Sequence, residues 1–305
     1  MAQIHRVGVI GSGIMGAGIA EVCARAGLDV LVGEENLEAA QAAEERVART
    51  LLGAVQAGKL TLARHNAARQ AIRFTIDLAD FADRELVIEA ITESEDAKLD
   101  VLARLDKVIA DRETILASNT SSIPIMKLAA ATQHPSRVIG MHFFNPVQVL
   151  DLVELTPCLL TSEQTYQRAE AFVTTTLGKT SIRCADRSGF VVNTLLIPYL
   201  LAAIRMAESG HASIADIDSA MVLGCGHPMG PLRLADLIGL DTVQAIASSM
   251  HEEFKEPLYA APPLLLRMVE GGLLGMKSGR GFYDYTASAR QERAQSADRS
   301  HSSSA

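Results

Sequence analysis

One stretch near the N-terminus limits the fold of this chain more than any other feature. Residues 6–10 form a short apolar run typical of a buried strand, and residues 11–16, GSGIMG, follow it and open a helical pattern. In a G-x-G-x-x-G turn the first glycine allows the tight turn, the second lets the backbone approach a pyrophosphate, and the third lets the helix pack on the strand. The sequence therefore predicts a dinucleotide-binding unit, with the pyrophosphate on the free N–H groups of the helix.

A second strand and a carboxylate follow this turn in the order that such a unit requires. Residues 29–32 predict the strand, and Glu34 closes it 18 residues after Gly16, where an acidic residue binds the ribose. This carboxylate would accept hydrogen bonds from the ribose hydroxyls of NAD and would repel the 2′-phosphate of NADP. Since no arginine occurs between residues 27 and 45, we expect NAD to be the preferred cofactor.

Strands and helices then alternate through the first half of the chain, as in an α/β domain. Further strands are predicted at residues 86–88, 114–117, 138–141 and 179–184, and helices at residues 36–56, 59–71 and 98–109. The segment 118–122, SNTSS, directly follows one of these strands. Its small polar side chains could cap a helix, or they could present hydroxyl and amide groups to a ligand at the strand end.

A histidine follows the strand at residues 138–141 and is the candidate for proton transfer. The strand runs through His142 into an aromatic pair and then into a turn signalled by Asn145 and Pro146. A second apolar segment, residues 147–155, carries Glu154 back toward the same region. Histidine suits acid–base work near neutral pH, and a carboxylate on one ring nitrogen fixes its tautomer. The alternative is a core histidine with a satisfied hydrogen bond.

The second half of the chain reads as helical throughout. Helices are predicted at residues 190–206, from 214 after a Ser213 cap, and at 231–237, 240–250 and 262–270. We therefore expect a Rossmann-type NAD-binding domain at residues 1–186, an all-α substrate and dimerisation domain at 187–285, and a disordered tail at 286–305. The small helical domain would gain from pairing its apolar helices with a second copy, so we expect a homodimer.

Composition and charge exclude several classes of function. The net charge is −8 and there is no long Lys/Arg block, which argues against a nucleic-acid partner. The longest uncharged run, residues 188–204, contains Pro198 and is short for a membrane span. The N-terminus lacks a secretory pattern, so we expect a cytoplasmic protein without membrane contact. The four cysteines lie far apart and indicate reduced thiols, and no metal site is expected.

Seven short motifs, taken in order, give the chain a specific resemblance. They are GSGIMG at 11–16, ASNTSS at 117–122, HFFNP at 142–146, LVE at 152–154, SGFVVN at 188–193, GHPMGP at 226–231 and KSGRGFYDY at 277–285. With these motifs the chain resembles the 3-hydroxyacyl-CoA dehydrogenase family over nearly its full length.

The resemblance implies a set of site residues. The catalytic residues would be Ser121, His142, Glu154 and Asn193. The cofactor contacts would be Gly11, Ser12, Gly13, Ile14, Met15, Gly16, Glu34, Glu93, Lys98, Ser121, Asn145 and Lys277. Coenzyme A would contact Ser121, Asn193, Thr50 and Lys59, and a second lysine usual in the family between the last two is replaced here, at Ala57.

The resemblance also implies the reaction, which is the NAD-dependent interconversion of (S)-3-hydroxyacyl-CoA and 3-oxoacyl-CoA, with short C4 substrates expected. Dehydrogenases of free hydroxy acids in the same superfamily resemble HPxNPP where this chain has HFFNP, which favours the acyl-CoA branch. A hydroxyacyl group on a carrier protein, a free hydroxy acid and a non-catalytic dinucleotide-binding protein remain the alternatives. The joint presence of Ser121, His142, Glu154 and Asn193 argues against the last of these.

Overall fold

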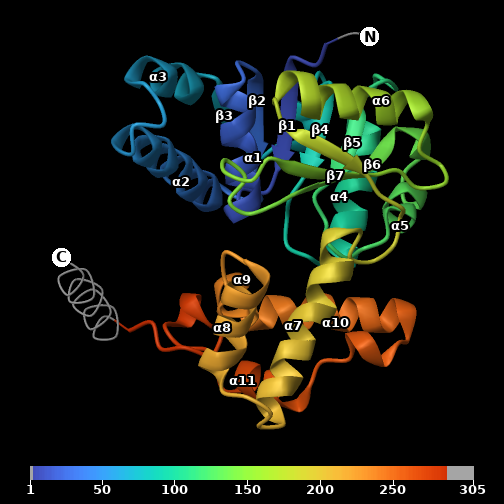
Figure 1. Cartoon of the computed structure of the whole chain (residues 1–305). Coiled ribbons are helices and arrows are strands. Elements are labelled where there is room, and N and C mark those ends of the chain that lie inside the picture. The colour runs from blue at the N-terminus through green and yellow to red at the C-terminus, as the bar shows by residue number, and fades with distance from the viewer. Residues whose placement is uncertain (1–2, 287–305) are drawn as a thin grey trace. The chain divides into compact units, whose positions relative to one another are not determined.

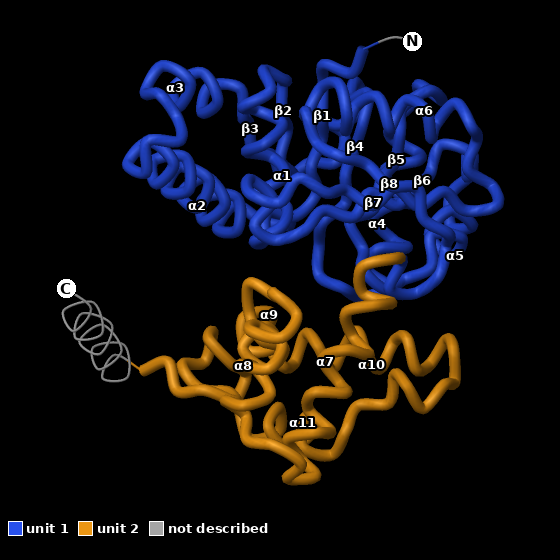
Figure 2. Tube along the Cα trace, viewed as in Figure 1, with its two compact units in different colours: residues 1–190 blue, residues 191–305 orange. Residues whose placement is uncertain are grey.

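The structure is a computed structural model that describes residues 3–286. The chain divides into two compact units, residues 1–190 and residues 191–305, which Figure 2 shows in blue and orange. The expected domain boundary at residue 186 falls between the last strand of the first unit and the first helix of the second. The expected tail, residues 286–305, lies outside the described residues except for Thr286.

The first unit is built on one eight-stranded sheet with the strand order β3-β2-β1-β4-β5-β6-β7-β8 (Figure 1). The strands are β1 (Arg6–Ile10), β2 (Asp29–Gly33), β3 (Ile72–Thr75), β4 (Leu86–Glu89), β5 (Ile115–Ser118), β6 (Val138–Phe143), β7 (Leu152–Thr156) and β8 (Thr180–Arg183). All neighbours pair in parallel except β6 and β7, which are antiparallel. The central strands are buried on both faces, which explains their continuous apolar runs.

Helices cover both faces of this sheet and form a separate apolar core with each. One core joins the sheet to α1 (Ile14–Arg25), α2 (Leu37–Gln56), α3 (Leu62–Gln70) and α6 (Glu163–Ala171). The other joins it to the short helix η1 (Leu78–Phe81), α4 (Glu95–Val108) and α5 (Ile125–Ala130). The predicted α/β dinucleotide-binding fold is therefore confirmed for the first unit.

The glycine-rich turn between β1 and α1 has the geometry that its sequence predicts. Gly11 has a φ of +85°, a conformation that an L side chain rarely adopts. A Cβ atom on Gly16 would lie 1.9 Å from the carbonyl oxygen of Gly11, so no larger residue fits there without moving the turn. These two glycines let α1 start directly behind the strand.

The second unit is helical, as predicted. Its helices are α7 (Val192–Glu208), α8 (Ile214–Cys225), α9 (Pro231–Ile238), α10 (Leu240–Phe254) and α11 (Pro263–Glu270). They share one apolar core, to which α7 contributes residues at a spacing of three and four. Two buried carboxylates tie the unit together: Asp218 accepts hydrogen bonds from the first N–H groups of α9, and Asp236 accepts them from Phe282 and Tyr283. Among the described residues, no helix is both long and apolar enough to span a bilayer.

Sequence patterns did not predict strand β3 or helices α5 and α6 of the first unit, and the ends of several helices differ from those expected. Strand β3 lies at the sheet edge with only partial burial, and its four residues, IRFT, alternate between apolar and polar over too short a stretch to stand out. Helix α5 is six residues long, and α6 is predominantly polar, which explains why neither pattern was recognised. The predicted helix at 98–109 begins earlier, at Glu95, and the one at 59–71 begins later, after a Thr61 cap.

Candidate active site

His142 and Glu154 face each other on adjacent strands. They are register partners in the antiparallel pair of β6 and β7, and His142 Nδ1 lies 2.7 Å from Glu154 Oε2. Glu154 is fully buried, and the His142 side chain is 9% exposed. A carboxylate accepts hydrogen bonds, so Nδ1–H is the donor that suits this contact with Glu154, and in that tautomer of the neutral imidazole Nε2 keeps its electron pair. The predicted pairing of these two residues is therefore present as a direct contact.

Two aromatic rings enclose the imidazole. The centroid of the Phe144 ring lies 4.5 Å from the centroid of the imidazole, and that of the Phe190 ring lies 5.6 Å from it. Both phenyl rings are tilted against the imidazole plane. Phe190 has a φ of +46°, which is uncommon for a residue with a side chain and is found where the surroundings hold the backbone in place. Asn119 Oδ1 accepts a hydrogen bond of 2.8 Å from the N–H of Phe143, next to the histidine. Together these contacts fix the histidine in one orientation.

The N-terminus of α1 has the features of a pyrophosphate site. Gly13 is the N-cap residue and offers no side chain, and no acidic residue lies in the first turn. The N–H groups of that turn therefore have no side-chain acceptor. A Cβ atom on Gly13 would meet nothing within 4 Å, so open space adjoins this backbone, and the Ile14 side chain beside it is 72% exposed. These residues fit an NAD molecule whose pyrophosphate binds the helix N-terminus.

The backbone of Ser12 binds one acidic and one basic side chain. Its N–H donates a hydrogen bond of 2.5 Å to Glu34 Oε1, so the predicted ribose-binding carboxylate does lie at the glycine-rich turn. Its carbonyl oxygen accepts a hydrogen bond from Arg46 Nη1, on α2. Arg46 lies just beyond the stretch 27–45 and approaches residue 12 only through the fold, so the sequence alone did not indicate it.

A buried ion pair supports the polar segment that follows β5. Lys98 Nζ lies 2.5 Å from Glu89 Oε1 and 3.4 Å from Glu93 Oε2, and Lys98 is 1% exposed. Ser118 Oγ donates to the other oxygen of Glu89 at 2.5 Å. Glu89, which sequence reasoning did not select, thus joins β4, α4 and β5.

Glu93 organises the loop that contains Ser121. Its Oε1 accepts hydrogen bonds from Thr120 Oγ1 at 2.5 Å, from the N–H of Ser121 at 3.0 Å and from Ser122 Oγ at 3.0 Å. Burial acts to raise the pKa of Glu93, but the Lys98 ammonium and these hydrogen bonds outweigh it and hold the pKa below its usual range. The segment 118–122 is therefore a structured loop held by a carboxylate. The structure brings the predicted residues Glu93, Lys98 and Ser121 together.

The other predicted contact residues of the first unit are exposed. Thr50 lies on α2, Ala57 is the C-cap residue of that helix, and Lys59 follows in the next turn. The Thr50 hydroxyl donates to the carbonyl oxygen of Arg46, one turn earlier, at 2.9 Å. Asn145 is exposed in the turn directly after Phe144.

Two predicted residues belong to the second unit. Asn193 is buried in the first turn of α7. Lys277 lies in the short helix η5 (Met276–Ser278), and its Nζ donates to Asp241 Oδ2, in the first turn of α10, at 2.6 Å. Burial acts to raise the pKa of Asp241, and the hydrogen bond and charge of Lys277 outweigh it and lower the pKa. Sequence reasoning selected Lys277 but not its partner.

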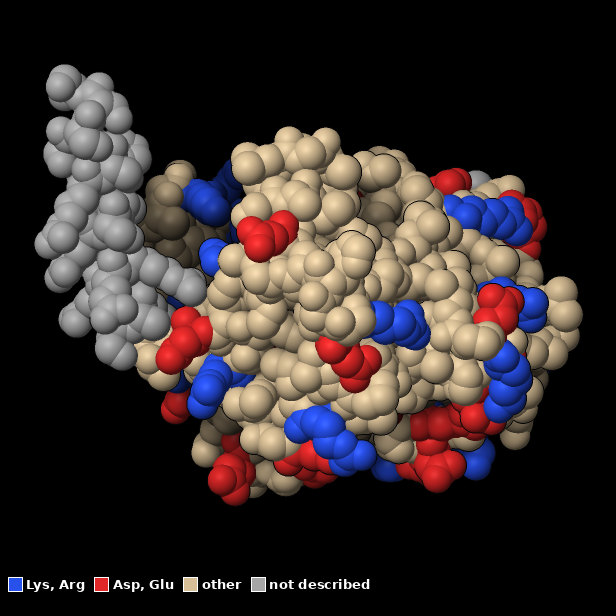
Figure 3. Space-filling model, turned by 60° about the horizontal axis from the view of Figure 1, so that its bottom comes forward, with Lys and Arg blue, Asp and Glu red and all other residues tan. Residues whose placement is uncertain are grey.

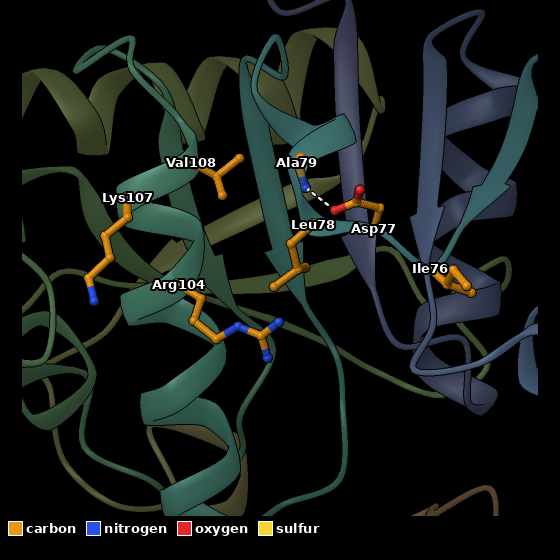
Figure 4. A pocket seen from close by; sticks show the side chains of 7 residues that line it. All are labelled: Ile76, Asp77, Leu78, Ala79, Arg104, Lys107 and Val108. Atoms are coloured by element: carbon orange, nitrogen blue, oxygen red, sulfur yellow. Dashed lines mark hydrogen bonds between the residues drawn. The ribbon is translucent and has the colours of Figure 1, made fainter.

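A hollow of about 630 Å³ opens between η1 and α4, away from these residues. Figure 4 shows its lining, with Arg104 and Lys107 on one side and Asp77 on the other, where Asp77 accepts a hydrogen bond from the N–H of Ala79. It contains none of the predicted site residues.

Acidic and basic side chains are interspersed on the face of the molecule that Figure 3 shows. Within residues 3–286, no group of three or more His, Cys, Asp or Glu side chains is arranged to hold a metal ion.

Comparison with protein families gives a match for each unit. Residues 6–187 match the family model of the 3-hydroxyacyl-CoA dehydrogenase NAD binding domain, and residues 189–285 match that of the 3-hydroxyacyl-CoA dehydrogenase C-terminal domain. Together these matches cover nearly all of the described chain.

Individual relatives agree with these matches. The chain is 58% identical to a 3-hydroxybutyryl-CoA dehydrogenase of Mycobacterium tuberculosis over 282 residues, which are 92% of this chain and 99% of the relative. It is 45% identical to a probable 3-hydroxybutyryl-CoA dehydrogenase of Bacillus subtilis, covering 93% of this chain and 98% of that one. The crystal structure of M. tuberculosis FadB2 is 58% identical with a TM-score of 0.93, and covers 93% of this chain and 100% of its own. That of the (S)-3-hydroxybutyryl-CoA dehydrogenase PaaH1 from Ralstonia eutropha is 43% identical with a TM-score of 0.88, with the same two coverages.

Proposed function

The chain belongs to the 3-hydroxyacyl-CoA dehydrogenase family, and we propose that it interconverts (S)-3-hydroxyacyl-CoA and 3-oxoacyl-CoA with NAD, with His142 as general acid and base. The observation that carries this assignment is the 2.7 Å contact between His142 Nδ1 and Glu154 Oε2. It leaves Nε2 as the basic nitrogen near the carboxyl end of β6, and ligands of this class of fold bind at the carboxyl ends of the strands.

The proposed proton transfer uses the chain's own residues. In the oxidative direction His142 Nε2 removes the proton of the 3-hydroxyl group, and in the reductive direction it returns that proton to the oxygen. Glu154 keeps Nδ1 protonated and stabilises the imidazolium that forms. The chemistry that NAD supplies when bound is hydride acceptance from C3, and hydride donation in reverse. The residues that would hold NAD are those of the glycine-rich turn, with Glu34 on the ribose, together with Glu93, Lys98, Asn145 and Lys277.

Polar side chains would fix the substrate. We assign Ser121 a hydrogen bond to the reacting oxygen or the thioester carbonyl, because its loop is held in place by Glu93. Asn193 is assigned a similar contact because it matches the asparagine of the family motif SGFVVN. Thr50 and Lys59 are assigned to coenzyme A, and both are exposed, Thr50 on α2 and Lys59 just after it, where a large ligand can reach them. These assignments rest on the family motif and on the local geometry of each residue.

The acyl group is proposed to be short, with C4 preferred, because the relatives at 58% and 45% identity are named for 3-hydroxybutyryl-CoA.

We propose residues 1–186 as the NAD-binding domain and residues 187–285 as the substrate and dimerisation domain. Exposed apolar side chains on α7 and α8, Leu195 at 72% and Leu223 at 84%, support a homodimer through the second domain.

The test is NADH oxidation with a series of substrates. Acetoacetyl-CoA should be reduced, and 3-oxoacyl-CoA thioesters of C10 and C16 should have markedly lower kcat/KM. Free acetoacetate and an acetoacetyl carrier protein, assayed alongside, address the alternative substrates. No turnover of acetoacetyl-CoA would contradict the proposed reaction, and a higher kcat/KM on the long thioesters would contradict the proposed chain length.

A further inference from the structure

The segment that follows β8 joins the candidate catalytic pair at both of its ends. It begins at Cys184, whose N–H donates a hydrogen bond of 2.9 Å to the carbonyl oxygen of Leu155, the residue after Glu154 on β7. It ends at Phe190, whose ring centroid lies 5.6 Å from that of the His142 imidazole. All of these residues belong to the first unit. The conformation of this short segment therefore decides where the phenyl ring meets the histidine.

Asp186 fixes the middle of the segment to α5. Its Oδ1 accepts a hydrogen bond of 2.6 Å from the N–H of Ile125, and its Oδ2 accepts one of 2.7 Å from the N–H of Met126. These are the first two residues of α5, and the N-cap residue Pro124 offers that helix no side-chain acceptor. Because each carboxylate oxygen binds a different N–H group, the segment and the helix are joined in one orientation.

Helix α5 continues the loop that contains Ser121. Thr120 Oγ1 accepts a hydrogen bond of 3.0 Å from the N–H of Ile123, so the loop leads into the helix through an ordered turn. Glu93 binds the N–H of Ser121 at the start of this stretch. Two carboxylates therefore hold the loop and the helix that follows it, and the second of them, Asp186, also holds the segment of the phenyl ring.

The backbone just before the ring is in an uncommon conformation. Gly189 has a φ of +83° and Phe190 a φ of +46°, and the N–H of Phe190 donates a hydrogen bond of 3.1 Å to the carbonyl oxygen of Arg187. A residue with a side chain keeps a left-handed φ only where its surroundings hold it. The ring packs in the same apolar core as Ile125, which is itself bound to Asp186. We therefore expect the position of the ring to depend on Asp186.

We propose that Asp186 is a positioning residue of the reaction, which acts by holding the Phe190 ring against the His142 imidazole. The ring limits the rotation of the imidazole, so that Nε2 stays directed at the reacting oxygen. A displacement of a catalytic group by a fraction of an ångström lowers the rate, although the cofactor is still bound. This inference rests on the proposed function, since it concerns the role of His142 in that reaction.

The experiment is a double-mutant cycle in the full-length chain, with Asp186→Asn, Phe190→Leu and the double variant. Asparagine keeps the size of the side chain and one acceptor oxygen, but its NH₂ group opposes the second backbone N–H. With NADH and acetoacetyl-CoA, Asp186→Asn should lower kcat about tenfold and leave the KM for NADH within about threefold. In the Phe190→Leu background the same substitution should lower kcat by less than about threefold, because the ring through which Asp186 acts is absent.

The matched control is Asp77→Asn, at an exposed carboxylate that accepts the N–H of Ala79 at the start of η1. It should leave kcat unchanged. The thermal midpoint is measured for every variant, and if Asp186→Asn does not fold, Asp186→Ser, which keeps one hydroxyl acceptor, replaces it in the cycle.

The outcomes separate this inference from the proposed function. A folded Asp186→Asn protein with wild-type kcat and a lowered thermal midpoint would overturn the inference, because Asp186 would then serve stability alone. The same loss of kcat in both backgrounds would also overturn it, since Asp186 would not act through Phe190. A wild-type chain without activity on acetoacetyl-CoA would instead contradict the proposed function.

Discussion

Lys98 Nζ lies 2.5 Å from Glu89 Oε1, and both side chains are shielded from solvent, at 1% and 0% exposure. Lys98 belongs to α4 and Glu89 ends β4. The same carboxylate oxygen of Glu89 accepts a hydrogen bond from the N–H of Ile91 at 2.8 Å. A buried charge without its partner is costly, so each residue depends on the other. Lys98 Nζ also lies 3.4 Å from Glu93 Oε2, and Glu93 holds the loop of Ser121, so the pair connects the packing of the sheet with the candidate site.

Replacing one member of this pair should destabilise the fold. Glu89→Gln removes the nearer, fully buried carboxylate of Lys98 and leaves only the longer contact with Glu93 at 3.4 Å, so we expect the free energy of unfolding to fall by about 3 kcal/mol. Urea unfolding followed by circular dichroism measures this change. Asp100→Asn is the matched control, because it breaks the exposed pair with Arg104 at 3.4 Å and should cost less than about 1 kcal/mol. Equal effects of the two substitutions would contradict the role of Glu89.

The low pKa of Glu93 predicts a pH dependence of stability. A carboxyl group whose pKa is lower in the folded state stabilises the fold above its unfolded pKa, and this contribution is lost as the pH falls through the folded pKa. The wild type should therefore be more stable than Glu93→Gln at pH 7. The difference should shrink below a pH of about 4.5, which is the ordinary pKa of a glutamate side chain. Thermal unfolding of both proteins between pH 7 and pH 3 measures it. A difference independent of pH would rule out the ionised form of Glu93 as its cause.

Glu34 should control the preference for NAD. Like charges at this ribose cost on the order of 1–3 kcal/mol, which corresponds to roughly tenfold to over a hundredfold in affinity. Glu34→Gln removes the charge and keeps an oxygen for the N–H of Ser12, so the NADH/NADPH ratio of kcat/KM should fall by about tenfold or more. The control is Glu38→Gln, in the exposed first turn of α2. A ratio that stays at the wild-type value would show that Glu34 does not select the cofactor.

Glu154→Gln should reduce catalysis and leave the pairing of β6 and β7 intact. A glutamine amide can donate to Nδ1 and so favour the wrong tautomer, and it cannot stabilise the imidazolium; we expect kcat to fall by about 10²–10⁴. Because Glu154 is buried, the thermal midpoint is measured in parallel to separate catalysis from stability. Glu163→Gln, on an exposed carboxylate paired with Arg183, serves as the control. A variant with wild-type kcat would mean that Glu154 has a structural role only.

Much of the fold could be predicted because its central strands are buried on both faces and its glycine-rich turn is specific. Strand β3 was not predicted, since its alternating pattern spans only four residues at the sheet edge. In the site, His142 and Glu154 were identified from their residue types and the family motifs. Arg46 and Glu89 were not, because they act through contacts with residues distant in the sequence or in another element. Arg46 contacts a residue 34 positions away, and Glu89 requires α4 and β5 to pack against β4.

The assignment of His142 as general acid and base is the central claim, and one substitution tests it directly. The measurement is kcat for acetoacetyl-CoA reduction by His142→Gln, with the dissociation constant of NADH and the thermal midpoint measured on the same preparation. His65→Gln, at a half-buried histidine on α3 outside the candidate site, is the matched control and should behave as wild type. We predict that His142→Gln binds NADH within about threefold of wild type and loses about 10²–10⁴ in kcat. A folded His142→Gln protein with kcat near the wild-type value would contradict the account.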